Sequence, residues 1–197
     1  MIHALPGMGG DHRMFSGKWL TLPDFIAHDW IEYNGELTLD DVARSVCDAR
    51  NIRDGDILVG ASLGGMVACE IGRIRKIPQI FLVGSAIHHN EINHALAALR
   101  PLLTITPLRL MKHLAAKSSS QLLQMFAATD LAFMRAMSRA IFEWNGFDAT
   151  STRVHRIHGA RDWVIPPPPK AELLLDGGHL VSMTHAVQCA AYVHQFV

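Results

Sequence analysis

The stretch GASLGG at residues 60–65 decides the fold of this chain. It follows a short apolar run at 56–59 and precedes a helical pattern at 66–75. A strand, a tight turn with the pattern G-x-S-x-G and a helix, in that order, are typical of a nucleophile elbow. Such a turn holds Ser62 clear of the backbone, at the carboxyl end of a strand and over the N-terminus of a helix.

The position of Ser62 suits nucleophilic chemistry. The N–H of Leu63 and the dipole of the following helix can stabilise an oxyanion beside the serine. The flanking glycines avoid a Cβ that would crowd the turn. The alternative interpretation is a Gly-rich connection with an incidental serine, and the rest of the chain has to decide between the two.

Length and composition indicate one globular domain over residues 1–197. The chain has 197 residues and a formal net charge of zero, enough for a real core and a modest insertion. No basic run points to nucleic acid or to an anionic membrane surface. No apolar stretch reaches spanning length, and the N-terminus lacks the pattern of a signal peptide.

The cysteines and histidines indicate a reduced compartment and no metal. Cys47, Cys69 and Cys189 are few, odd in number and far apart, as expected of free thiols in a cytoplasmic protein. The close histidine pairs, at 88–89 and at 155 and 158, do not supply the ligand count of a zinc site. We therefore expect no metal and no cofactor.

A Gly-rich loop at 6–11 follows the first short strand at 2–5. Its glycines allow backbone amides to face a ligand. The same G-x-G, with Glu32 near the end of the second strand, also fits a dinucleotide-binding loop. That fingerprint requires a third glycine at position 12, where this chain has His12, so it fits less well.

The apolar patterns predict an α/β fold with a mostly parallel, open sheet of about six strands and helices on both faces. The run at 80–83 is continuously apolar, as in a parallel sheet buried on both sides. Thr38 and Asp41 form a capping-box pattern before one helix. The prolines at 166–169 leave no room for a crossover helix before the last strand. A final amphipathic helix is expected at 182–196. The strands are expected at 2–5, near 29–32, and at 56–59, 80–83, 154–157 and 172–175, in the order 2-1-3-4-5-6.

Residues 86–149 interrupt the alternation of strands and helices. This segment is rich in helix formers and methionine, with helices expected near 92–100, 107–117 and 120–144. It is too long for a simple crossover, so it is interpreted as an inserted helical cap. Its apolar stripe either packs the cap or lines a pocket, and methionine suits both roles.

Three polar residues lie where three strands end. Ser62 follows the third strand, Asp162 the fifth and His179 the sixth. Because parallel strands end at one edge of a sheet, the three side chains should meet there. His179 would then take the Ser62 proton and return it to the leaving group, while Asp162 orients the imidazole. Asp176 is an alternative for the acid, although it lies only three residues before His179.

Together these motifs resemble the α/β-hydrolase superfamily. The resemblance implies a cap after the strand that follows the elbow helix, and an oxyanion hole made by the N–H groups of Met8 and Leu63. Two features depart from the family pattern: Pro6 replaces the usual histidine, and the chain begins at what looks like the family's third strand. The motifs are 6-PGMG-9, 60-GASLGG-65, 158-HGARD-162 and 178-GH-179.

The leading functional hypothesis is a serine hydrolase that cleaves a small ester, thioester or related acyl compound through an acyl-enzyme. An acyltransferase or a carbon–carbon hydrolase or lyase would use the same triad, and a non-catalytic small-molecule receptor would keep the same fold. The expected partner is a small acyl substrate, and a homodimer is possible. The substrate pocket is expected to involve Gly7, Gly9, Met125, Phe126, Trp144 and Ile165.

Overall fold

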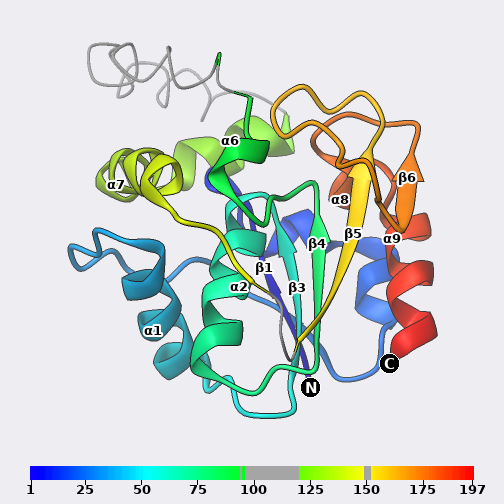
Figure 1. Ribbon diagram of the computed structural model, residues 1–197, viewed down its shortest axis with the longest axis horizontal. Helices are drawn as coiled ribbons and strands as arrows, with labels where there is room; N and C mark the ends of the chain where they lie inside the picture. The colour runs from blue at the N-terminus through cyan, green and yellow to red at the C-terminus, as the bar shows by residue number, and fades with distance from the viewer. Residues whose placement is uncertain (94, 96–119, 149–151) are drawn as a thin grey trace.

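The fold is built on a six-stranded parallel sheet (Figure 1). The computed structural model describes residues 1–93, 95, 120–148 and 152–197. The strand order β2-β1-β3-β4-β5-β6 confirms the order expected from the sequence. The strands are β1 (Ile2–Leu5), β2 (Phe25–Ala27), β3 (Ile57–Ala61), β4 (Gln79–Val83), β5 (Arg153–Gly159) and β6 (Leu173–Leu175).

Helices cover both faces of this sheet, as the sequence predicts (Figure 1). One face carries α1 (Leu39–Arg50) and α2 (Leu63–Ile74). The other carries α8 (Val181–Thr184) and α9 (Ala186–Val193), which pack with the short 3-10 helices η1 (His12–Phe15) and η2 (Gly17–Thr21). Two helices, α6 (Gln121–Ala128) and α7 (Leu131–Glu143), lie above the carboxyl ends of the strands, and η3 (His89–Glu91) and η4 (His194–Phe196) complete the described elements.

The central strands bury side chains on both faces. Leu58 of β3 and Ile80 of β4 pack in the apolar cluster beneath α1 and α2. Their neighbours Val59 and Phe81 point the other way, into the cluster beneath α8 and α9. This alternation explains why the two strands are continuously apolar in sequence. Among the described helices, none has the length and apolar character needed to cross a membrane.

The second strand lies earlier than the sequence analysis placed it. Expected near 29–32, it spans Phe25–Ala27 and pairs with β1 up to Ala4. The reason is the length of its neighbour: β1 ends at Leu5, and the following Pro6 has no N–H for a ladder. Beyond its last backbone bond, from His28 N to Ala4 O, the chain is free to form a loop.

Two long helices expected from the sequence are interrupted. The segment 120–144 forms α6 and α7, because the Asp130 carboxylate accepts hydrogen bonds from the N–H groups of Ala132 and Phe133 and so begins a new helix. The segment 182–196 is likewise divided at His185 into α8, α9 and η4. The helices expected near 92–100 and 107–117 fall mainly outside the described residues. The capping box of Thr38 and Asp41 is present.

A chain of polar groups is buried at the amino end of β1. His3 Nδ1 lies 2.8 Å from His28 Nε2, and His3 Nε2 lies 3.3 Å from Asp56 Oδ2. Burial lowers the pKa of both histidines, to about 4 for His28. Both imidazoles are therefore neutral in the folded protein at pH 7.

This pair makes stability depend on pH. Between pH 6.5 and 4 the unfolded chain binds protons at His28 that the folded chain does not, so acid favours unfolding. We expect the melting temperature to fall as pH is lowered from 7 to 5, and to fall less in His28→Gln, whose amide can still hydrogen-bond His3. His194→Gln, an exposed site, should keep the wild-type slope. Equal slopes for wild type and His28→Gln would contradict this account.

Candidate active site

Ser62 forms the whole connection between β3 and α2. The strand ends at Ala61 and the helix begins at Leu63, and Ser62 has φ 51° and ψ −119°. A positive φ is costly for a residue with a Cβ and is found where the surroundings enforce it. Here Ser62 N donates to Val83 O at 3.1 Å, and Ser62 O accepts from Ser85 Oγ at 2.6 Å. These two hydrogen bonds hold the strained turn against the end of β4 and the residues that follow it.

The glycines around Ser62 allow the end of β1, the end of β3 and the start of α2 to lie in contact. A Cβ on Gly60 would overlap the backbone of Gly65, and a Cβ on Gly64 would overlap the carbonyl oxygens of Leu5 and Pro6. The start of α2 therefore lies directly against the end of β1 and the loop that follows. A Cβ placed on Gly7 of that loop would be 3.5 Å from Ser62 Cβ, so Gly7 lies beside the serine.

The structure brings together the three side chains predicted to form the triad. His179 Nε2 lies 3.0 Å from Ser62 Oγ, and His179 Nδ1 lies 2.8 Å from Asp162 Oδ2. Because a carboxylate accepts the Nδ1 proton, Nε2 is left with the lone pair that can accept the serine hydroxyl. The imidazole is 18% exposed and the carboxylate is fully buried, so the pair meets solvent only through the histidine ring.

The alternative acid, Asp176, does not contact His179. Its carboxylate is 84% exposed and pairs with Arg161 at 3.0 Å. Asp162, in contrast, is held by backbone N–H groups at the carboxylate oxygen that does not bond His179. Its Oδ1 accepts hydrogen bonds from the N–H groups of Val164 at 2.9 Å and Ile165 at 3.0 Å. These bonds satisfy the buried oxygen that does not face the histidine.

Ile165 and His158 support Asp162 in ways that the sequence analysis did not anticipate. Ile165, predicted to line the pocket, is buried in the core, and its backbone N–H holds Asp162. His158 Nε2 lies 2.9 Å from Ile165 O and 3.8 Å from Asp162 Oδ2. Burial lowers the pKa of His158, so its ring is neutral at pH 7. The sequence signal that could have identified His158 is the His-Gly pair at the start of the 158–162 motif.

The loop after β1 presents unused backbone donors near the serine. Gly7 O accepts from Gly10 N at 3.0 Å and from Trp30 Nε1 at 2.9 Å. The N–H groups of Met8 and Leu63 donate to no residue in the described part of the chain. Trp30 was not predicted as a site residue, because nothing in the sequence links it to a loop twenty-three residues earlier.

The predicted pocket residues divide into two groups. Phe126 contacts the loop, since a Cβ on Gly9 would lie 3.3 Å from its ring, and Met125 is buried on the wall of a cavity beside the loop. Trp144 lies elsewhere. Its indole N–H donates to Glu70 Oε1 at 2.6 Å, and its ring lines a separate cavity between α7 and the helices α1 and α2. Trp144, predicted to line the pocket, thus lies at the contact between the end of α7 and α2.

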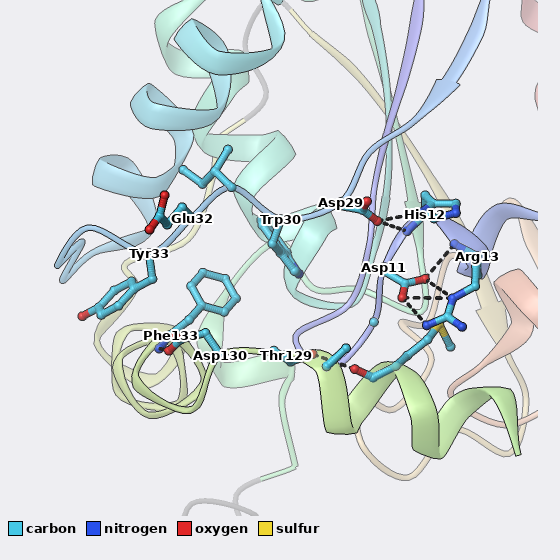
Figure 2. A pocket seen from close by; sticks show the side chains of 14 residues that line it. Asp11, His12, Arg13, Asp29, Trp30, Glu32, Tyr33, Thr129, Asp130 and Phe133 are labelled. Atoms are coloured by element: carbon cyan, nitrogen blue, oxygen red, sulfur yellow. Dashed lines mark hydrogen bonds and ion pairs between the residues drawn. The ribbon is translucent and has the colours of Figure 1, made fainter. Parts of the chain in front are cut away.

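The cavity beside the loop has a volume of about 600 Å³ (Figure 2). It lies between the loop after β1, the loop after β2, and helices α6 and α7. Its walls combine aromatic rings with acidic side chains, and Arg13 is the only lysine or arginine among the described lining residues. The aromatic residues are Trp30, Tyr33 and Phe133, and the acidic ones are Asp11, Asp29, Glu32 and Asp130.

Three of the lining residues could offer ligands to a metal ion. The ligand atoms of Asp11, His12 and Asp29 lie within 4.8 Å of one another. Both carboxylates already have strong partners. The Arg13 guanidinium donates two hydrogen bonds to the Asp11 carboxylate, and both the backbone N–H and the ring of His12 bond Asp29 Oδ1. The carboxylate charge is thus partly neutralised by the protein itself.

The dinucleotide-binding interpretation fits the loop poorly. A pyrophosphate requires a helix N-terminus after the glycines. The loop instead leads into the four-residue helix η1, whose N-terminal cap is the Asp11 carboxylate. A negative group at that position repels phosphate.

Comparison with known proteins supports the fold. No protein-family model and no curated protein sequence matches the chain. Among solved structures, a hydrolase from Oleispira antarctica is 17% identical with a TM-score of 0.78, over 99% of this chain and 89% of that one. An esterase from Exiguobacterium antarcticum is 14% identical with a TM-score of 0.75, over 99% and 90%. The RedJ thioesterase of the prodiginine biosynthetic pathway in Streptomyces coelicolor is 17% identical with a TM-score of 0.65, over 100% and 85%.

These likenesses extend over almost the whole of each chain. Together with the parallel sheet and the serine between β3 and α2, they define the fold. This chain has the α/β-hydrolase fold, as the sequence motifs predict. At 14–17% identity the likeness establishes the fold and leaves the chemistry to be argued from the site.

The close approach of the elbow to the loop after β1 can be tested by adding one methyl group. Gly64→Ala should destabilise the fold by about 1–3 kcal/mol or more, because rigid backbone carbonyls surround the new Cβ. Gly178→Ala is the matched control, since its Cβ would meet only Arg161 O at 3.9 Å. The measurement is urea unfolding of both variants. A Gly64→Ala protein as stable as Gly178→Ala would contradict the described packing.

Proposed function

We propose that this chain is a serine hydrolase that cleaves a small ester, thioester or related acyl compound. The observation that carries the proposal is the continuous hydrogen-bonded chain from Ser62 Oγ through His179 to the buried Asp162. A serine held at a positive φ between a strand and a helix has no simple structural role, and the strain supports a functional one.

The proposed reaction begins with attack by Ser62 Oγ on the acyl carbon. His179 Nε2 takes the serine proton and passes it to the leaving oxygen or sulfur, so that a covalent acyl-enzyme forms. A water molecule, deprotonated by the same nitrogen, then attacks the acyl carbon. The bond to Ser62 Oγ breaks, His179 returns the proton to that oxygen, and the acid is released. Asp162 keeps the imidazole in the required tautomer and stabilises it while it is charged.

The negative oxygen of the tetrahedral intermediates requires donors. The N–H groups of Met8 and Leu63 are proposed for this role. Leu63 follows Ser62 in the chain, Met8 follows Gly7, which lies beside Ser62, and neither N–H has a partner among the described residues. The N-terminus of α2 adds the favourable end of its dipole. Preorganised donors of this kind are typically the largest single contribution to such catalysis.

Acyl transfer and carbon–carbon bond cleavage use the same three side chains, so they remain alternatives within the proposal. The names of the structural neighbours support hydrolysis, since they include esterases and a thioesterase. The non-catalytic receptor is disfavoured by the complete hydrogen-bonded chain, which a binding protein does not need.

The nucleophile is tested by removing one oxygen atom. Ser62→Ala should lose at least about a thousandfold in kcat on short-chain p-nitrophenyl esters and on acyl thioesters, because triad members act as a unit. Ser16→Ala is a control that removes an exposed serine hydroxyl with no capping hydrogen bond and leaves the surroundings of Ser62 unchanged. Circular dichroism should show both variants folded.

Two results would contradict the assignment. One is a Ser62→Ala protein that keeps a substantial part of the wild-type rate. The other is a wild-type protein that hydrolyses none of the esters and thioesters while binding a small molecule tightly, which would favour the receptor.

The cavity beside the loop predicts how the protein discriminates by charge. Among the residues that the structure describes, four carboxylates and one arginine line it, so a negatively charged substrate group should be disfavoured there and a cationic group favoured over aromatic walls. We expect kcat/KM to rank acetylcholine above its neutral isostere 3,3-dimethylbutyl acetate, and both above a matched ester with a carboxylate. The ranking should weaken at high salt.

Glu32→Gln separates this electrostatic effect from shape. It should reduce the ratio of cationic to neutral kcat/KM by roughly threefold, as expected for one partly solvated charge several ångströms away. Glu143→Gln is the matched control, because Glu143 lines the other cavity. An unchanged ratio in Glu32→Gln, or an equal change in both variants, would show that this cavity does not receive the charged group.

A further inference from the structure

We propose that Trp30 is a positioning residue for the oxyanion hole: its indole N–H fixes the direction of the peptide group between Gly7 and Met8. The inference rests on the proposed function and adds to it a residue that lies outside the triad and its donors. Three observations support it: the hydrogen bond to Gly7 O, the trans geometry of the peptide, and the anchoring of the Trp30 loop.

The hydrogen bonds to Gly7 account for both lone pairs of its carbonyl oxygen. Trp30 Nε1 lies 2.9 Å from this oxygen and Gly10 N lies 3.0 Å from it. In a trans peptide group, the C=O of one residue and the N–H of the next point in opposite directions. Because Gly7 O points toward Trp30, the Met8 N–H points away from Trp30. Gly7 itself lies beside Ser62.

This peptide needs an external restraint. Glycine has broad backbone freedom, so the Gly7–Met8 peptide can rotate at modest cost. A rotated peptide would present a carbonyl oxygen where the developing oxyanion requires an N–H, replacing attraction with repulsion. Without Trp30, the N–H of Gly10, from the same loop, would be the carbonyl's one remaining donor among the described residues.

Trp30 is itself held from several elements (Figure 2). Its ring lies against Phe133 of α7, with 5.1 Å between ring centroids, and packs on the apolar cluster under α1 and α2. The preceding residue, Asp29, is bonded through its backbone oxygen to Arg50 at 2.8 Å and through its carboxylate to His12 N at 3.0 Å. The indole N–H is thus fixed in place before any substrate binds.

The test replaces Trp30 with phenylalanine, which keeps an aromatic ring and removes the N–H. We expect kcat to fall about tenfold, less than the hundredfold or more that follows removal of an oxyanion donor itself. KM should stay within about twofold. The affinity for phenylboronic acid, which forms a tetrahedral adduct on a nucleophilic serine, should fall by a factor similar to that in kcat. Titration with a fluorophosphonate counts the competent sites, so that kcat refers to folded protein.

Trp144→Phe is the matched control. It also removes an indole N–H from a single hydrogen bond, to Glu70, at a distance from the loop after β1. Its kcat and boronate affinity should equal those of wild type. An unchanged kcat in Trp30→Phe would overturn the proposal, and so would a loss confined to KM, because that would make Trp30 a cavity wall alone.

A measurement on the wild-type protein covers the case in which Trp30→Phe folds poorly. The indole proton of Trp30 should exchange slowly with solvent, and the Met8 amide proton should shift downfield when phenylboronic acid binds. Rapid indole exchange or an unmoved Met8 resonance would overturn the proposal. Failure of the proposed function is seen separately, as activity that survives in Ser62→Ala.

Discussion

The structure depends on one strained residue, Ser62, which turns the chain from β3 into α2 in a single step. A positive φ at a serine is tolerated only because its neighbours supply hydrogen bonds and lack side chains. Gly60 and Gly64 let the helix start lie against the strand and against the end of β1. The same contacts bring the loop after β1 to the serine, so the fold and the site share one constraint.

Much of this arrangement could be predicted from sequence because it depends on local sequence patterns. Apolar runs located five of the six strands. Ser62, Asp162 and His179 follow three of these runs, which indicated that their side chains meet at one edge of the sheet. The second strand was placed wrongly because its extent is set by its partner β1, which stops at Pro6. The break between α6 and α7 was missed because Asp130 was not recognised as a helix cap.

The contacts that distinguish this site from a generic one were beyond sequence analysis. Trp30 contacts the loop after β1, and Glu32 lines the neighbouring cavity, from a loop whose path depends on tertiary packing. His158 lies in β5, and its contact with Ile165 O depends on tertiary packing as well. The triad geometry and the cavity beside the loop therefore differ in how specific they are to this chain. The former is common to the fold, while the acidic and aromatic walls belong to this chain and are where its specificity is proposed to lie.

Covalent labelling tests the central claim most directly. A fluorophosphonate reacts with a serine only where a base and an oxyanion hole activate it. The account predicts one adduct per chain by intact mass, mapped by peptide sequencing to Ser62, and no adduct on denatured protein. An adduct on a different residue, such as Ser85 or Ser182, or a folded protein that remains unlabelled, would contradict it.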